Sequence, residues 1–371
     1  MRFLLVVPPL AGHVAPLRGV ASVLAARGHA VAWCGPDPEL STLVAGRVFP
    51  AGDSRPFAVA LRPPGLRGFA ALKYLWESYL VPLADAMVPG VQSAVSSFEP
   101  DVVVVDQQAM AGALVASRCG LPWATSASTS TELADPLGSL PKIASWVSDL
   151  QAGLRARHGV LLGDLRFSPH LVLAFTTRAL AGESGLAVPV SYVGPALPAV
   201  PGEWSPADDR PLVVVTLGTS NAAAGARFLA ESVDAFAGMP SVQGLVVDPT
   251  GHLISESAGL ARWIPQPAVF AHASAVVCHG GHNTVCEALS AGVPLVVAPI
   301  RDDQSMLAQQ VVTASAGVRL RFDRAKAADI RDAVTTVLST SDYSAGAARI
   351  RASFEAAGGA EEAATHLESL G

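Results

Sequence analysis

Residues 277–304, VCHGGHNTVCEALSAGVPLVVAPIRDDQ, contain side-chain types that can build either a metal site or an anion site. A zinc site needs three or four converging ligands, and the candidates here are Cys278, His279, His282 and Cys286. If a helix follows the double glycine, Cys286 lies far from the turn that carries Cys278 and His279. We therefore expect no metal site, and we expect both cysteines to be small core residues.

The same stretch has the features of a diphosphate site. Gly280 and Gly281 let the backbone approach a ligand closely, and Asn283 and Thr284 stand where a helix begins. The free N–H groups and positive dipole end of a helix start suit phosphate, and His279 adds a donor. Because the chain has neither GxGxxG nor a P-loop lysine, a dinucleotide oxidoreductase or a kinase is poorly supported. We expect a nucleoside diphosphate of another kind.

An α/β scaffold must position these turns. Continuous apolar strands alternate with helices, beginning at RFLLVVPPLAGH and again at PLVVVTLGTSN from residue 211. This alternation is typical of parallel strands buried on both faces of a doubly wound sheet. In such sheets ligands bind beyond the carboxyl ends of the strands. Polar turns follow five expected strands, at 9–13, 105–108, 216–221, 279–284 and 299–304.

Length and proline content predict the domain organisation. The chain has 371 residues, half of them apolar, which favours two domains of ordinary size. A proline-rich segment interrupts the alternation before residue 211. We expect an N-terminal domain over 1–196, a linker over 197–211, a C-terminal domain over 212–342 and a helical tail over 343–371 that can pack back on the N-terminal domain.

Charge and cysteine content exclude several classes of partner. The formal net charge is −6 with acids and bases interspersed, which argues against nucleic acid or an anionic membrane. No apolar run has the length of a membrane span, and the N-terminal run lacks a cleavage site. The four cysteines form no CxxC pair, which favours reduced thiols. We expect a cytoplasmic monomer or homodimer with small-molecule partners.

Residues 263–304 resemble a known signature. This segment contains, in order, WIPQ, HGG, NT, Glu287 and DQ. The same elements in the same order resemble the donor-binding region of nucleotide-sugar-dependent glycosyltransferases of family 1. The likeness is greatest to bacterial enzymes that decorate antibiotics and related natural products, and a weaker likeness extends over the whole chain. The resemblance implies the GT-B fold: two Rossmann-like domains that face a cleft, the first for the acceptor and the second for the donor, with the linker as hinge.

The resemblance also implies roles at the donor site. Trp263 offers a flat apolar surface to the base, and the carboxylate of Glu287 can accept from ribose hydroxyls. The implied set is Thr219, Ser220, Trp263, Gln266, His279, Gly280, Gly281, Asn283, Thr284, Glu287, Asp303 and Gln304. The donor is a dTDP- or UDP-sugar, with a deoxysugar expected. It is a co-substrate, and neither a cofactor nor a metal is expected.

Individual residues of this set have simpler explanations. Trp263 can be a core residue, Glu287 a capping carboxylate and Asp303 a turn former. The sequence also departs from the family after DQ, where Ser305 and Met306 replace a frequent Asn-Ala pair. The residue after the second glycine is His282, which we expect to contribute backbone rather than chemistry. These departures leave the identity of the sugar open.

A catalytic pair is implied as well. His13, in AGHVAP, matches the family's base, and Asp106, which ends DVVVVD, matches its partner. An imidazole titrates near neutral pH and can take a proton from an acceptor hydroxyl as its oxygen attacks the anomeric carbon. The carboxylate would fix its tautomer and orientation, and the displacement would invert the anomeric configuration. The alternatives are a solvated loop histidine and an aspartate that caps the next helix.

An aromatic insert in the first half is expected to form the acceptor wall. Phe57, Phe69, Tyr74, Trp76 and Tyr79 would contact a hydrophobic natural-product aglycone, although core packing explains such residues equally well.

Three other functions share parts of this pattern. A GT-B-type sugar-nucleotide epimerase would use the donor site without an acceptor. A non-catalytic binding homologue would keep the fold, but the His13 and Asp106 pair speaks against it. An N-acetylglucosamine transferase of cell-wall synthesis is disfavoured because no basic or amphipathic membrane-docking patch is evident.

Overall fold

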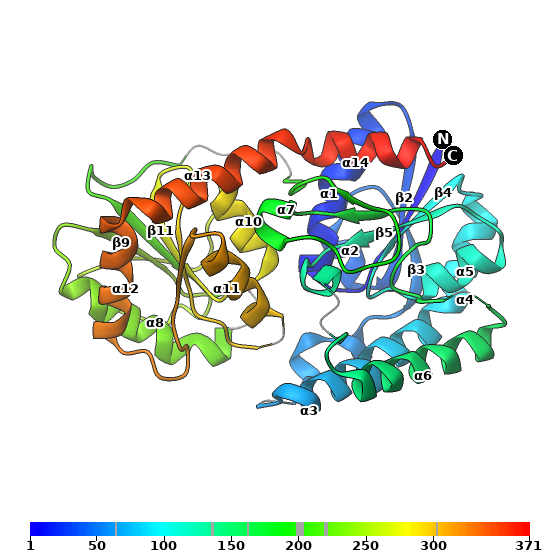
Figure 1. Cartoon of the computed structure of the whole chain (residues 1–371), viewed down its shortest axis with the longest axis horizontal. Coiled ribbons are helices and arrows are strands. Elements are labelled where there is room, and N and C mark those ends of the chain that lie inside the picture. The colour runs from blue at the N-terminus through cyan, green and yellow to red at the C-terminus, as the bar shows by residue number, and fades with distance from the viewer. Residues whose placement is uncertain (64, 135–136, 162, 198–203, 219–221, 302) are drawn as a thin grey trace. The chain divides into compact units, whose positions relative to one another are not determined.

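The structure, a computed structural model, describes every residue except 64, 135–136, 162, 198–203, 219–221 and 302 (Figure 1). The chain forms two compact units. Unit 1 comprises Met1–Thr176, Glu183–Pro198 and Ala357–Gly371, and unit 2 comprises Thr177–Gly182 and Ala199–Ala356.

Unit 1 is built on a seven-stranded parallel sheet with the order β3-β2-β1-β4-β5-β6-β7. Its central strands are apolar on both faces because helices cover both faces. The strands are β1 (Arg2–Val6), β2 (Ala30–Asp37), β3 (Arg47–Asp53), β4 (Val102–Asp106), β5 (Trp123–Ala127), β6 (Val172–Ala174) and β7 (Val190–Tyr192).

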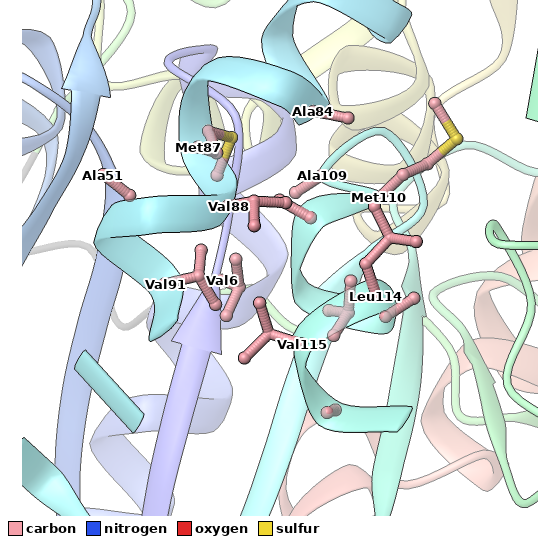
Figure 2. Close-up of a cluster of buried hydrophobic side chains, with 14 of the residues drawn as sticks. Val6, Ala51, Ala84, Met87, Val88, Val91, Ala109, Met110, Leu114 and Val115 are labelled. Atoms are coloured by element: carbon pink, nitrogen blue, oxygen red, sulfur yellow. The ribbon is translucent and has the colours of Figure 1, made fainter. Parts of the chain in front are cut away.

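The two faces of this sheet carry different helices. Helix α1 (Ala11–Ala26), the short α2 (Glu39–Leu43) and α14 (Gly359–Glu368) pack on one face. On the other face lie α4 (Val81–Phe98), α5 (Ala111–Arg118) and α6 (Pro141–His158). Figure 2 shows side chains of α4 and α5 packing together beside Val6 of β1. The remaining helical segments are η1 (Arg55–Phe57), η2 (Val59–Leu61), α3 (Gly68–Lys73), the π-helical η3 (Tyr74–Leu80) and η4 (Thr131–Ala134).

Unit 2 repeats the design with a six-stranded parallel sheet of order β10-β9-β8-β11-β12-β13. The strands are β8 (Leu212–Thr216), β9 (Gln243–Val247), β10 (Gly259–Ala261), β11 (Ala273–Cys278), β12 (Leu295–Val297) and β13 (Gly317–Arg319). Helices α8 (Ala222–Ala237) and α12 (Ala327–Ser339) cover one face. The other face carries α9 (Gln266–Phe270), α10 (His282–Ser290), α11 (Gln304–Thr313) and α13 (Ser341–Ala356). The prediction of two doubly wound α/β units is confirmed.

The bounds of the units differ from those expected from the sequence. The segment expected as one tail divides at Ala356: α13 packs within unit 2, whereas α14 packs on α1 in unit 1 (Figure 1). Leu367 of α14 is fully buried there, and Arg27 at the end of α1 pairs with Glu361 and Glu368. Helix α7 (Arg178–Ala181) lies in unit 2 because Leu180 enters the apolar cluster of that unit. Among the described helices, none combines the length and apolar character needed to cross a bilayer.

Each sheet has one topological switch point, where ligands bind in folds of this kind. In unit 1 the chain runs from β1 outward to β3 and then returns to β4 beside β1, with Val6 opposite Val105. In unit 2 it runs from β8 outward to β10 and returns to β11, with Thr216 opposite Cys278. The segments after these four strands should therefore carry the functional residues.

Candidate active site

The switch point of unit 1 brings His13 and Asp106 together. His13 lies in the first turn of α1, directly after β1, and Asp106 is the last residue of β4. His13 Nδ1 lies 3.0 Å from Asp106 Oδ1; the carboxylate is fully buried and the imidazole is 17% exposed. A buried carboxylate at this distance favours a proton on Nδ1, and Nε2 is then the nitrogen that can accept one.

Asp106 is held in place by its own turn. Its Oδ1 also accepts a hydrogen bond from the Gln108 backbone N–H at 2.9 Å, and α5 begins only at Ala111. Its Oδ2 is buried, and no described residue donates to it. The carboxylate therefore bonds the turn and the imidazole, and it does not serve as the N-cap of α5, whose N-cap residue is Met110.

Two further polar residues at this switch point were missed by sequence reasoning. Ser128 directly follows β5, and its Oγ lies 2.7 Å from His13 Nδ1. Gln107 is 2% exposed, and within the described part of the chain neither polar atom of its side chain has a hydrogen-bond partner. Both residues follow strands that neighbour the switch point, which is the signal that could have singled them out.

The predicted aromatic wall divides between core and surface. Phe57 and Trp76 are 8% and 2% exposed, and both belong to the main core cluster of unit 1. Tyr79 meets Phe57 edge to face, and burial together with the charge of Asp106 raises the pKa of its hydroxyl. Tyr74 is partly exposed, and Phe69 is 53% exposed. Core packing therefore accounts for Phe57 and Trp76, whereas Phe69 and Tyr74 offer surface.

At the switch point of unit 2, His279 is enclosed by glycine backbone. His279 follows β11 and is 8% exposed. A Cβ atom on Gly218, which follows β8 with a φ of +67°, would lie 3.0 Å from His279 Cε1. A Cβ on Gly281 would lie 2.4 Å from His279 Nε2, closer than van der Waals contact allows. Both positions therefore need glycine, and Gly218 was not singled out from the sequence.

The electrostatics around His279 favour a neutral ring. Burial lowers the pKa of His279 to about 4, and the positive charge of Arg301 contributes to this shift. A neutral imidazole has one N–H donor, and among the described residues its Nδ1 has no partner. Arg301 is therefore a cation close enough to act on this ring, although it was not singled out from the sequence.

Gln266 links the two strands of this switch point. Its Nε2 donates to Thr216 Oγ1 at 3.2 Å, and its Oε1 accepts from Thr284 Oγ1 at 3.3 Å. Thr284 and Asn283 lie in the first turn of α10. Trp263 is 71% exposed, so the explanation of this residue as core is wrong.

The carboxyl group of Glu287 lies further along α10. The first turn of this helix contains no acidic residue, so the explanation of Glu287 as a capping carboxylate is wrong. Burial raises the pKa of Glu287 to about 7. Among the described residues none donates a hydrogen bond to this carboxylate, which can therefore accept bonds from a ligand.

The remaining donor-site predictions lie near the start of α11 or outside the described residues. Gln304 Oε1 accepts from the backbone N–H groups of Ile300 and Arg301 at 2.9 and 3.0 Å, so its NH₂ group is the end that can reach a ligand. Asp303 is the N-cap residue of α11 and makes no capping bond with its side chain. Thr219 and Ser220 lie outside the described residues.

The cysteines of this region are core residues. Cys278 and Cys286 are buried in the apolar cluster of unit 2, and burial raises the pKa of Cys278 to about 12. Cys286 Sγ lies 3.6 Å from His282 Nε2. The described part of the chain contains no group of three or more His, Cys, Asp or Glu side chains that could hold a metal ion.

Comparison with known proteins identifies relatives of both units. Residues 206–352 match the family model of UDP-glucoronosyl and UDP-glucosyl transferase, which spans the signature at 263–304. The 4'-demethylrebeccamycin synthase of Lentzea aerocolonigenes is 29% identical over all of this chain and 99% of its own length.

Solved structures share the fold over the whole chain. The glycotransferase of kitacinnamycin superposes with a TM-score of 0.82 at 24% identity, covering all of this chain and 98% of that one. Spinosyn rhamnosyltransferase SpnG, complexed with thymidine diphosphate, has a TM-score of 0.78 at 23% identity, covering 99% of this chain and all of that one.

Proposed function

The chain is a glycosyltransferase of the GT-B fold whose second unit carries the UDP-glucoronosyl and UDP-glucosyl transferase domain, and on that premise we propose an inverting transfer reaction. A sugar moves from a nucleoside diphosphate to a hydroxyl of a hydrophobic natural-product aglycone, with His13 as the general base. The observation that carries this proposal is the 3.0 Å contact of His13 Nδ1 with the buried Asp106 carboxylate.

The relatives and the site support a thymidine or uridine diphosphate donor. SpnG is known in complex with thymidine diphosphate, and the family model is that of UDP-sugar transferases. The exposed indole of Trp263 stacks on the base and the Glu287 carboxylate accepts from the ribose. Asp303 and the NH₂ group of Gln304 bond the sugar, for which a deoxysugar is proposed. Gln266 acts by positioning Thr284.

The diphosphate is held by backbone and charge. The first turn of α10, with Asn283, presents N–H groups and a positive dipole end, and His279 adds one N–H donor. Arg301 supplies a full positive charge close to His279. Thr219 and Ser220 complete the proposed set.

The reaction is a single displacement. His13 Nε2 takes the proton of the acceptor hydroxyl while the acceptor oxygen forms a bond to the anomeric carbon. The bond from that carbon to the diphosphate oxygen breaks, and its electron pair leaves with the diphosphate. Asp106 stabilises the imidazolium that results.

We propose that transfer needs no divalent metal. The diphosphate charge that develops on departure is met by Arg301, the His279 N–H and the start of α10. Excess EDTA should leave the steady-state rate unchanged, measured as nucleoside diphosphate released. A large loss of rate that added Mg²⁺ restores would contradict this proposal.

Glu287 should make nucleotide binding depend on pH. Because its pKa is about 7 in the free protein, the carboxyl is largely protonated below that pH and must lose its proton to accept from the ribose. The dissociation constant of the nucleoside diphosphate should rise as the pH falls below 7, by up to about tenfold per pH unit. Glu287→Gln should abolish that part of the dependence, whereas Glu256→Gln, at an exposed position, should keep it.

Glu287→Gln should also change the stability of the fold, and the direction of this change follows from the raised pKa of Glu287. The pKa of Glu287 in the fold lies above its ordinary value of 4.5, so the stability it contributes is present below pH 4.5 and is lost as the pH rises through 7. At pH 8 the unliganded Glu287→Gln variant should be more stable than the wild type, on the order of 3 kcal/mol. If the wild type and the Glu287→Gln variant had the same denaturation midpoint at pH 8 and the same pH dependence of nucleotide binding, Glu287 would not be the buried group that accepts from the ribose.

One experiment separates transfer from the alternatives. A panel of nucleotide sugars is screened for thermal stabilisation, and the best donor is incubated with and without hydrophobic aglycones. Nucleoside diphosphate should be released together with a glycoside only when an acceptor is present. Conversion of the donor sugar without an acceptor would indicate an epimerase, and binding without any turnover would indicate a non-catalytic homologue.

A further inference from the structure

Three neighbouring strands of unit 1 each place one polar side chain at the same point. His13 follows β1, Asp106 ends β4 and Ser128 follows β5, and β4 lies between the other two strands. Ser128 is 4% exposed, and its Oγ lies 2.7 Å from His13 Nδ1. The same nitrogen lies 3.0 Å from Asp106 Oδ1. One ring nitrogen therefore has two oxygen partners.

A ring nitrogen carries at most one proton, so the two contacts allow two arrangements. In the first, Nδ1 carries the proton and donates it to Asp106 and Ser128 together, and Nε2 keeps its lone pair. In the second, the Ser128 hydroxyl donates to a bare Nδ1, and the proton sits on Nε2. Only the first arrangement leaves Nε2 able to accept a proton from a substrate.

The environment of Asp106 favours the first arrangement. Among the described residues, its Oδ2 has no partner, and its Oδ1 has a single donor besides His13, the Gln108 N–H. If Nδ1 carried no proton, the fully buried Asp106 carboxylate would keep only the hydrogen bond from the Gln108 N–H. Hydrogen bonds to a charged group are about twice as strong as neutral ones, so the carboxylate outweighs the hydroxyl in the competition for the proton.

We propose that Ser128 is a positioning residue for the catalytic base: its hydroxyl oxygen accepts from His13 Nδ1–H beside Asp106. This inference rests on the proposed role of His13. Ser128, which follows β5, and Asp106, at the end of β4, together hold the imidazole ring of His13 in one orientation. The serine also stabilises the positive charge that the ring gains when Nε2 takes the proton, because it accepts from the cationic N–H.

Ser128→Ala tests the proposal, with Ser126→Ala as a matched control. Ser126 is also a buried serine of the β5 region, opposite Asp106 in the sheet register, and its Oγ has no partner among the described residues. We expect Ser128→Ala to lower kcat about tenfold and to move the acidic limb of the pH–rate profile to lower pH. Ser126→Ala should do neither, and Ser128→Thr, which keeps the hydroxyl, should retain most of the rate. The affinity for nucleoside diphosphate should not change.

Two results would overturn the inference. The first is a Ser128→Ala profile that superposes on that of the wild type. The second is an acidic limb displaced to higher pH, because it would mean that the hydroxyl donates to Nδ1. If Ser128→Ala fails to fold, ¹⁵N NMR of the wild-type protein decides: a protonated Nδ1 and bare Nε2 of His13 at alkaline pH support the proposal, and the opposite tautomer refutes it. Full activity of His13→Ala would instead refute the proposed base itself.

Discussion

Replacing His13 by alanine should lower kcat by about a thousandfold while leaving the affinity for the nucleoside diphosphate unchanged. The imidazole is the one described group at the switch point of unit 1 that is paired with a buried carboxylate and can act as a proton acceptor. The described residues proposed to bind the nucleotide lie in unit 2, which has its own sheet and core. Turnover is measured with a saturating acceptor, and nucleotide binding by calorimetry.

Two variants sharpen this test. His170→Ala removes an exposed histidine of the same unit and should retain full activity. Asp106→Asn keeps the shape of the side chain but removes the charge, and we expect a loss of at least about a hundredfold because the amide no longer favours Nδ1–H. A His13→Ala enzyme with unchanged turnover would exclude base catalysis by this residue.

Replacing Gly281 by alanine should weaken nucleoside diphosphate binding by more than about tenfold. The new Cβ would lie 2.4 Å from His279 Nε2 and 2.7 Å from Cε1, so the ring or the turn must move. Either movement takes the His279 N–H and the first N–H groups of α10 away from the positions proposed to hold the diphosphate. The proposed catalytic pair, His13 and Asp106, lies in unit 1, so the loss should appear in nucleotide affinity and not in the chemical step.

Gly259→Ala is the matched control, because its Cβ would meet Leu245 at an ordinary 3.5 Å in the same unit. This variant should bind as the wild type does. Equal affinities for the Gly281→Ala and Gly259→Ala proteins would show that the diphosphate is not held at this turn.

The pattern of strands and helices predicted the fold because each strand and each turn can be recognised from residues that are close together in the sequence. Parallel strands buried on both faces read as continuous apolar runs, and the turns that follow them are polar. That rule also pointed to the turns that hold His13, Asp106 and His279. It could have pointed to Ser128, which follows β5 directly, but a single serine after an apolar strand has no chemical pattern of its own.

Features that depend on distant contacts could not be predicted. Trp76 and Trp263 are the same residue type, but the first is buried beneath Arg166 and the second is exposed. An amphipathic tail predicts helices without saying which surface covers them, and here Leu367 packs on unit 1 while α13 packs on unit 2. Arg301 acts on His279 through space, from the turn after β12.

The anomeric configuration of the product tests the central claim most directly, which is a single displacement assisted by the His13 and Asp106 pair. The donor and the isolated glycoside are compared by the ¹H coupling constant of the anomeric proton. The account predicts that the configuration at the anomeric carbon is inverted relative to the donor. A product with retained configuration would contradict it, because retention requires a second displacement or an ion-pair route in which His13 is not the base for direct attack.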